Sequence, residues 1–191
     1  MRLKLVIIHR YKSKSSGDTD PKGWIFYLCQ MRKLFTLSFI FLLICICAKA
    51  QSPARIKIGD LMQRLEDKDT LYVVNFWATW CPPCVAELPE FNRADTAWAG
   101  KAVKIILVSL DFPESWPVKL NEFLTKKQIH PEVVWLDETD ANIFIPPVSP
   151  HWSGSIPATL ISCKATHTRE FKESKIDFIY LNEQIRNGLL H

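Results

Sequence analysis

The sequence predicts an α/β fold in which helices flank a central β-sheet of mixed strand direction. Two observations lead to this prediction. Between residues 71 and 136, short apolar runs alternate with longer amphipathic stretches, a pattern typical of parallel strands joined by helices. Beyond residue 157, two strand-like runs lie close together and a helical stretch follows them. This second pattern indicates an antiparallel pair of strands and a closing helix.

The best-defined elements lie in the middle of the chain. Residues 71–77 (LYVVNFW) are rich in β-branched and aromatic side chains, as a buried strand should be. Residues 103–110 are almost wholly apolar, which is typical of a parallel strand covered on both faces. From residue 82 onward, apolar side chains recur at three-residue steps, as on one face of a helix that ends near Gly100.

The remaining elements are predicted from shorter stretches. An irregular or extended approach over 51–58 precedes a short helix at 60–66, for which Asp60 is the expected cap. A long, proline-containing connection covers 137–156. The other expected elements are a helix at about 114–128, a strand at 133–136, an antiparallel pair at 158–163 and 168–171, and a helix at 175–190.

Residues 31–50 have the layout of a secretory signal peptide. A charged start is followed by an apolar core, and a small-residue cleavage pattern ends at Ala50. The apolar core is shorter than the roughly 20 residues that a membrane span needs. We therefore expect cleavage near Ala50 and export, to the periplasm or its equivalent, with an uncleaved membrane anchor as the alternative. Residues 1–30 are interpreted as an upstream mis-start or a disordered segment, which leaves 51–191 as one folded domain.

The net charge changes sign when the first 50 residues are set aside. The whole chain has 24 Lys and Arg residues against 20 Asp and Glu residues. Residues 1–50 hold nine of the basic residues and two of the acidic ones, so residues 51–191 carry a net charge of −3. With the first 50 residues set aside, nothing in the charge argues for the basic surface of a nucleic-acid-binding protein. The three cysteines of 51–191 are also too few for a structural disulfide framework.

The motif that carries chemistry is Trp80-Cys81-Pro82-Pro83-Cys84, at the junction of a predicted strand and a predicted helix. A CxxC sequence at such a junction is typical of a redox-active dithiol. Free N–H groups and the helix dipole favour a thiolate at Cys81, the expected nucleophile, and Cys84 is placed to resolve a mixed disulfide. Half of a zinc site is the alternative, but no second ligand pair accompanies the motif, so no metal is expected.

Pro82 and Pro83 suit the first helical turn, where no N–H partner is required. They also remove two N–H donors from the surroundings of Cys81. We therefore expect a modest lowering of the thiol pKa and a reducing rather than strongly oxidising protein.

The stretch from Asn75 to Cys84 (NFWATWCPPC), with Glu87, Pro89 and the later Ile156-Pro157, resembles the TlpA-like (ResA-like) branch of the thioredoxin family. The resemblance implies a thioredoxin-like fold with a helix–strand insertion at about 114–136. It implies an exported thiol–disulfide oxidoreductase, usually a reductant, with no cofactor. The implied partners are the thiols and disulfides of other proteins and a membrane-bound electron donor, and the implied state is a monomer.

The resemblance also implies roles around the two cysteines. Glu87 stands three residues after Cys84, where TlpA-like proteins carry an acid, whereas the buried strand acid of other thioredoxins is replaced by Asn75. A partly buried Glu87 with a raised pKa could take the proton of Cys84, on the same helix face. A solvated helix glutamate is the alternative.

Pro157 matches the family's cis-proline. A cis bond there would bring the backbone of Ile156 opposite Cys81, where an extended substrate could pair. Trp80, Pro82, Pro83, Ile156 and Pro157 are therefore the expected substrate-binding residues.

Several assignments stay open from the sequence. Cys163 is expected to be a buried, inert thiol, with a third redox thiol as the alternative. Asp111 either caps the following helix or approaches the site, and Trp152 lies either at the rim of the site or in the core. The contrasting functions are a redox-sensing binding module without turnover and, with less support, a thiol-dependent peroxidase.

Overall fold

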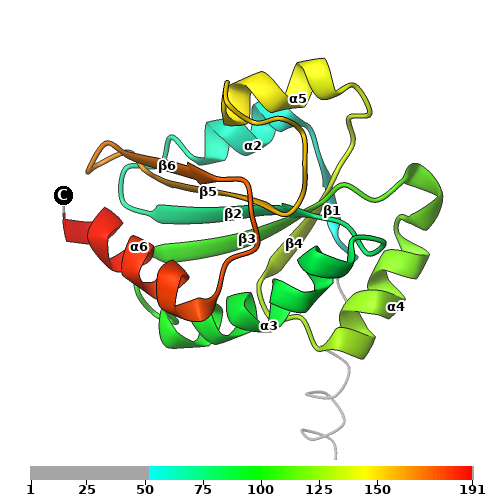
Figure 1. Ribbon diagram of the computed structural model, residues 1–191, viewed down its shortest axis with the longest axis horizontal. Helices are drawn as coiled ribbons and strands as arrows, with labels where there is room; N and C mark the ends of the chain where they lie inside the picture. The colour runs from blue at the N-terminus through cyan, green and yellow to red at the C-terminus, as the bar shows by residue number, and fades with distance from the viewer. Residues whose placement is uncertain (1–51, 191) are drawn as a thin grey trace, which may run out of the picture. The chain divides into compact units, whose positions relative to one another are not determined.

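Six strands form one sheet in the order β1-β4-β3-β2-β5-β6 in the computed structural model, which describes residues 52–190 (Figure 1). The expected leader at 31–50 and the upstream segment at 1–30 lie outside the described residues. The strands are β1 (Ala54–Ile56), β2 (Leu71–Trp77), β3 (Val103–Ser109), β4 (Glu132–Leu136), β5 (Ala158–Cys163) and β6 (Thr168–Lys172).

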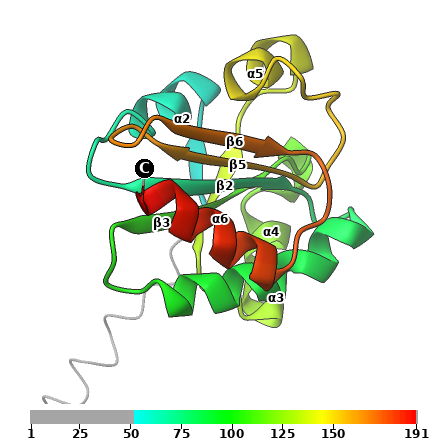
Figure 2. The same ribbon diagram turned by 60° about the vertical axis from the view of Figure 1, so that its left-hand side comes forward.

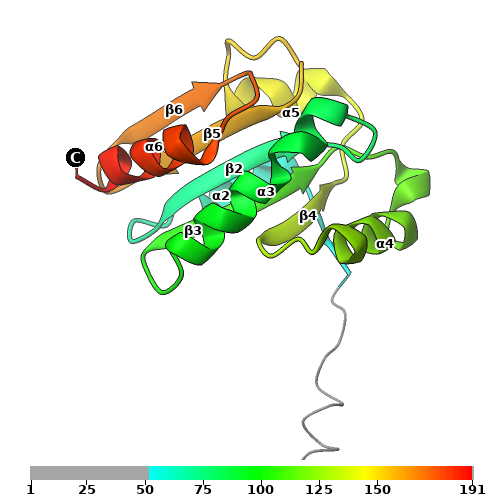
Figure 3. The same ribbon diagram turned by 60° about the horizontal axis from the view of Figure 1, so that its bottom comes forward.

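Helices cover both faces of this sheet, as Figures 1 and 3 show. The helices are α2 (Ile58–Arg64), α3 (Pro82–Ala97), the short 3₁₀ helix η1 (Pro113–Ser115), α4 (Val118–Lys127), α5 (Ala141–Val148) and α6 (Phe178–Leu190). In residues 52–190, no helix is both long enough and apolar enough to span a membrane.

The sheet is mixed because its central strand β2 has a parallel neighbour on one side and an antiparallel neighbour on the other. β2 pairs in parallel with β3, so Trp77 lies beside Ser109 at the carboxyl ends of both strands. On its other edge β2 pairs antiparallel with β5. Every residue of β2 is buried, as its run of apolar side chains predicts. The predicted α/β class and mixed sheet are confirmed.

Two apolar clusters fill the space between the sheet and its helices. The first lies under α3, α4 and α6 and includes Leu88, Phe91, Leu120 and Leu181. The second lies under α2 and α5 on the opposite face, and Figure 2 shows these two helices on the far side of the sheet from α6. The side chains of the central strands β2 and β3 alternate between the two clusters, which explains why these strands have no polar face.

The structure corrects two expectations near the amino-terminal edge of the sheet. The approach segment contains β1, which pairs in parallel with β4 and completes the sheet. Three residues are too few for a recognisable alternation of apolar and polar side chains, so this strand had no pattern of its own. Asp60 is not the cap of α2, because that helix begins at Ile58 after Lys57 and Asp60 lies in its first turn.

The long connection before β5 contains a helix that was not expected. α5 begins where the Asp140 carboxylate accepts a hydrogen bond from the backbone N–H of Asn142 at 2.9 Å. Pro146 and Pro147 lie inside α5, near its end. Prolines usually interrupt helices, and this pair suggested a loop. Here the helix is short, and its Val148 is buried against the sheet.

Candidate active site

Cys81 and Cys84 are joined by a disulfide at the start of α3. Cys81 is the N-cap residue, and the backbone N–H of Cys84 donates to its Sγ at 3.3 Å. Pro82 and Pro83 form the first turn, as their missing N–H groups permit. Because β2 and β3 end at the same edge of the sheet, the loops that follow them, 78–81 and 110–112, lie together beside this disulfide.

Glu87 is completely buried on the inner face of α3, in the series of buried positions that includes Cys84 and Leu88. Its Oε1 accepts a hydrogen bond from Asn75 Nδ2 at 2.8 Å, and its Oε2 accepts one from the backbone N–H of Ile176 at 2.9 Å. Burial raises the pKa of Glu87 from 4.5 to about 7, although these two donors oppose the rise. The alternative of a solvated surface glutamate is therefore wrong.

Asn75 connects this acid to the sheet. Its Nδ2 also donates to Thr159 Oγ1 at 3.1 Å, so β2, α3 and β5 meet at one buried amide. Its Oδ1 is buried and has no hydrogen-bond partner among the residues described. From the sequence, Asn75 was described only as a residue that cannot titrate. Its polar side chain in an otherwise apolar strand could have indicated a hydrogen-bond partner inside the fold, because buried polar groups are normally hydrogen-bonded.

Ile156 and Pro157 lie on the other side of the disulfide. The peptide bond between them is cis, and the carbonyl oxygen of Ile156 is 3.7 Å from Cys81 Sγ. Trp152 does not form the rim of this site. It is buried in the second core cluster, where its ring lies 4.8 Å from that of Phe76.

Asp111 is buried at the end of β3 and holds the loop that leads to Cys81. Its carboxylate accepts hydrogen bonds from the backbone N–H of Thr79 at 3.1 and 3.2 Å and from Thr79 Oγ1 at 2.5 Å. Ser109 Oγ donates to the same carboxylate at 2.8 Å. Asp111 does not cap the following helix, because η1 begins after Phe112 without a side-chain cap. Of the two positions expected for Asp111, as a helix cap or near the site, the structure shows the one near the site.

Trp80 is more than half exposed, and its ring stacks on that of Phe112 with centroids 5.9 Å apart. The sequence predicted Trp80 beside the site, whereas Phe112, which lies 32 residues further on, was not expected there. Cys163 is buried in β5 opposite Leu71 and is not part of the site, as the simpler of its two interpretations predicted. Within residues 52–190 no group of three or more His, Cys, Asp or Glu residues is placed to hold a metal ion.

Comparisons with known proteins give consistent similarities. The model of the AhpC/TSA family matches residues 47–144. Thiol-disulfide oxidoreductase ResA of Oceanobacillus iheyensis is 46% identical over 50 residues, which are 26% of this chain and 25% of that protein. Sporulation thiol-disulfide oxidoreductase A of Bacillus subtilis is 29% identical over 65 residues, 34% of this chain and 39% of that protein. The chain thus spans well under half the length of these curated relatives.

The fold has solved counterparts. The crystal structure of a thioredoxin-related protein from Neisseria meningitidis serogroup B matches with a TM-score of 0.57 and 19% identity, over 65% of this chain and 89% of that one. At this identity the match concerns the fold alone, and that fold is thioredoxin-like.

Proposed function

Because the chain belongs to the AhpC/TSA family, and within it to the TlpA-like (ResA-like) thioredoxins, we propose that it is a thiol–disulfide oxidoreductase acting on other proteins. The observation that carries this proposal is a CxxC disulfide at the start of a helix with a buried acid on the inner face of the same helix. Cys81 and Cys84 form the disulfide at the start of α3, and Glu87 lies one turn further along the same helix.

The proposed reaction moves two electrons from the dithiol to a substrate disulfide. The Cys81 thiolate attacks one substrate sulfur, a mixed disulfide forms, and the other substrate sulfur leaves as a thiolate that takes up a proton from solvent. Cys84 then attacks Cys81 Sγ, which releases the second substrate thiol and leaves Cys81 and Cys84 oxidised. Glu87 takes the Cys84 proton during this second attack, a role that suits a pKa of about 7.

The substrate is proposed to bind beside Trp80, along the backbone of Ile156 and Pro157. The carbonyl of Ile156 lies next to Cys81 Sγ and is available to an extended chain. Pro82 and Pro83 bring no N–H donor to the Cys81 sulfur, which supports a reductant rather than a strong oxidant.

The proposed setting is outside the cytoplasm. The layout of residues 31–50 supports export with cleavage near Ala50. An oxidising compartment would convert Cys81 and Cys84 to the disulfide, so the proposal includes a membrane-bound electron donor that reduces them again. The protein is proposed to act as a monomer on the thiols and disulfides of other proteins.

Insulin reduction with dithiothreitol as the electron source tests the activity. We expect turnover by the protein, loss of turnover in Cys81→Ser, and retention in the matched control Cys163→Ser, whose thiol is buried away from the site. Cys84→Ser should accumulate mixed disulfides through Cys81, because the resolving thiol is absent. Partner binding without any turnover would instead favour the redox-sensing binding module.

A further inference from the structure

Two large aromatic side chains lie exposed beside the disulfide. Trp80 is 54% exposed and Phe112 is 62% exposed, and their rings stack at an interplanar angle of 21°. Exposed apolar residues that occur singly need no explanation. A stacked pair next to a reactive atom is different, because aromatic side chains are enriched where one protein contacts another.

A buried hydrogen-bonded contact between Thr79 and Asp111 supports the loops that carry Trp80 and Phe112. Thr79 precedes Trp80 in the chain and Asp111 precedes Phe112, and the Asp111 carboxylate accepts hydrogen bonds from both the backbone N–H and the hydroxyl of Thr79. The bond that joins the two loops therefore also fixes the starting points of the two aromatic side chains.

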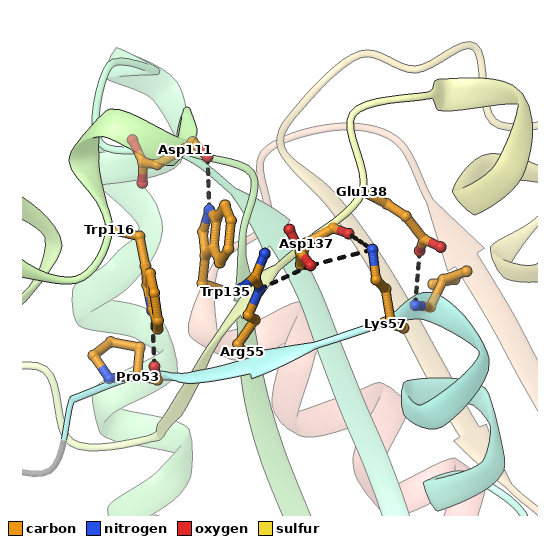
Figure 4. Close-up of polar contacts among 9 residues, drawn as sticks. Pro53, Arg55, Lys57, Asp111, Trp116, Trp135, Asp137 and Glu138 are labelled. Atoms are coloured by element: carbon orange, nitrogen blue, oxygen red, sulfur yellow. Dashed lines mark hydrogen bonds and ion pairs between the residues drawn. The ribbon is translucent and has the colours of Figure 1, made fainter.

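Asp111 is itself anchored to the sheet. Trp135 Nε1 donates to its backbone carbonyl at 2.7 Å, as Figure 4 shows, and Ser109 Oγ donates to its carboxylate. Trp135 in turn stacks on Trp116, with ring centroids 5.1 Å apart. A loop with this many buried contacts holds its exposed residue in a fixed place, which reduces the entropy lost when a partner binds.

The chemistry of the site specifies what meets this surface. In a mixed disulfide the substrate sulfur is bonded to Cys81 Sγ, and Cys81 is directly bonded in the chain to Trp80. Cys81 is only 5% exposed, so the substrate cysteine reaches a recessed atom while its neighbours in sequence remain outside. Consecutive residues of an extended chain are about 3.5 Å apart, so the residues next to that cysteine are the ones that meet the exposed side chains around the recessed sulfur.

We propose that Trp80 and Phe112 form a docking platform for an apolar side chain next to the reacting cysteine of a protein substrate, with Asp111 as its positioning residue. This rests on the proposed function and adds a substrate preference to it. Phe112 contacts the substrate, whereas Asp111 acts through the geometry of the platform.

Two synthetic peptides test the platform. Each contains one intramolecular disulfide, and they differ only in having Leu or Ser beside the cysteines. The pre-reduced protein is mixed with each peptide, and the second-order rate constant of reduction is measured. We expect the Leu peptide to be reduced several-fold faster, and Phe112→Ala to lower the Leu/Ser rate ratio about fivefold, as for loss of one aromatic contact.

The matched control is Ile179→Ala, which removes another exposed apolar side chain, from α6, and should leave the ratio unchanged. Asp111→Ala should lower the ratio as Phe112→Ala does, and the double variant should lower it no further, because both changes disable one platform. If Asp111 only stabilised the fold, Asp111→Ala would leave the Leu/Ser ratio at its wild-type value. Additive losses would mean that Asp111 acts on the substrate independently of Phe112.

Two results would overturn the inference. Equal rates for the two peptides, or an unchanged ratio in Phe112→Ala, would remove the platform while the reductions themselves upheld the oxidoreductase. Failure of the wild-type protein to reduce either peptide would overturn the proposed function and the platform with it.

Discussion

Asn75 Nδ2 donates a hydrogen bond to Glu87 Oε1 at 2.8 Å, so the central strand directly contacts the buried acid of the helix that bears the disulfide. Burial raises the pKa of Glu87, while the N–H of Ile176 and the amide of Asn75 stabilise its charged form. The balance leaves a carboxyl group that titrates near neutral pH. This relationship yields predictions about stability and about the pKa of Glu87.

The stability of the protein should depend on pH through Glu87. Its pKa rises from 4.5 to about 7 on folding, so the folded state binds the proton more tightly than the unfolded state. The resulting stabilisation is complete below pH 4.5 and is lost as the pH rises through about 7. We expect Glu87 to lower the free energy of unfolding by about 3 kcal/mol between pH 4 and pH 8.

Denaturant unfolding of the oxidised protein across this pH range measures the effect. Glu87→Gln is the comparison, because it keeps the shape of the side chain and cannot titrate. The difference in unfolding free energy between the two proteins should change with pH in the stated direction. A constant difference from pH 4 to pH 8 would show that Glu87 has an ordinary pKa.

Replacing Asn75 should raise the pKa of Glu87 further. Asn75→Leu removes one of the two donors to the carboxylate, which weakens the charged form, and we expect a rise of about one pKa unit. Carbon-13 NMR titration of the Glu87 carboxyl group measures it directly.

The matched control is Thr159→Val. Thr159 Oγ1 accepts a hydrogen bond from the same Nδ2 atom of Asn75, so its loss leaves both donors to the Glu87 carboxylate in place. The pKa of Glu87 should then change much less than in Asn75→Leu. Equal shifts in the two variants would mean that packing, and not the donated hydrogen bond, sets the pKa.

The elements with strong periodicity were predicted closely from the sequence. The strand at 71–77 has the expected bounds, and α3 begins at the expected Pro82. Both carry their pattern within one continuous segment, and burial on a sheet or helix face is what that pattern encodes. β1 and α5 were missed because their stability depends on contacts with β4 and with the opposite face of the sheet, which no local pattern records.

The residues of the candidate site likewise fall into those that the sequence predicted and those that it did not. Cys81, Cys84 and Glu87 lie within seven residues of one helix, so their spacing predicted their common face. Phe112 and Asp111 reach the same place from the end of β3, and only the parallel pairing of β2 with β3 brings them there. Side chains that meet through strand order are invisible to spacing along the chain.

Two arginine ion pairs should differ in their contribution to stability. Arg55 pairs with Asp137 at 2.8 Å and lies over the rings of Trp116 and Trp135, but it is 58% exposed (Figure 4). Arg64 makes two hydrogen bonds to Glu132, at 2.8 and 3.0 Å, in a less exposed position. Two parallel bonds to one carboxylate are stronger than a single exposed contact.

Arg55→Gln should therefore change the free energy of unfolding only slightly, whereas Arg64→Gln should cost about 1–2 kcal/mol. Urea unfolding at low salt measures both. The Debye length is about 8 Å near physiological salt, and 0.5 M salt is roughly three times more concentrated, so it screens exposed charges more strongly. Repeating the unfolding in 0.5 M salt should reduce the cost of Arg55→Gln more than that of Arg64→Gln, because the charge of Arg55 is the more exposed. A larger cost for Arg55→Gln would contradict this ranking.

Asp111 should contribute more to stability than its position in a loop suggests. Asp111→Ala leaves the backbone N–H and the hydroxyl of Thr79 and the hydroxyl of Ser109 without their acceptor in a buried setting. Unpaired buried donors are costly, so we expect a loss of about 2–4 kcal/mol in unfolding free energy. Ser109→Ala removes one donor from the same carboxylate and also the acceptor of the Asp111 backbone N–H, and it should cost about 1–2 kcal/mol. Thermal or urea unfolding of both variants measures the difference, and equal losses would mean that the contact with Thr79 does not hold the loop before Cys81.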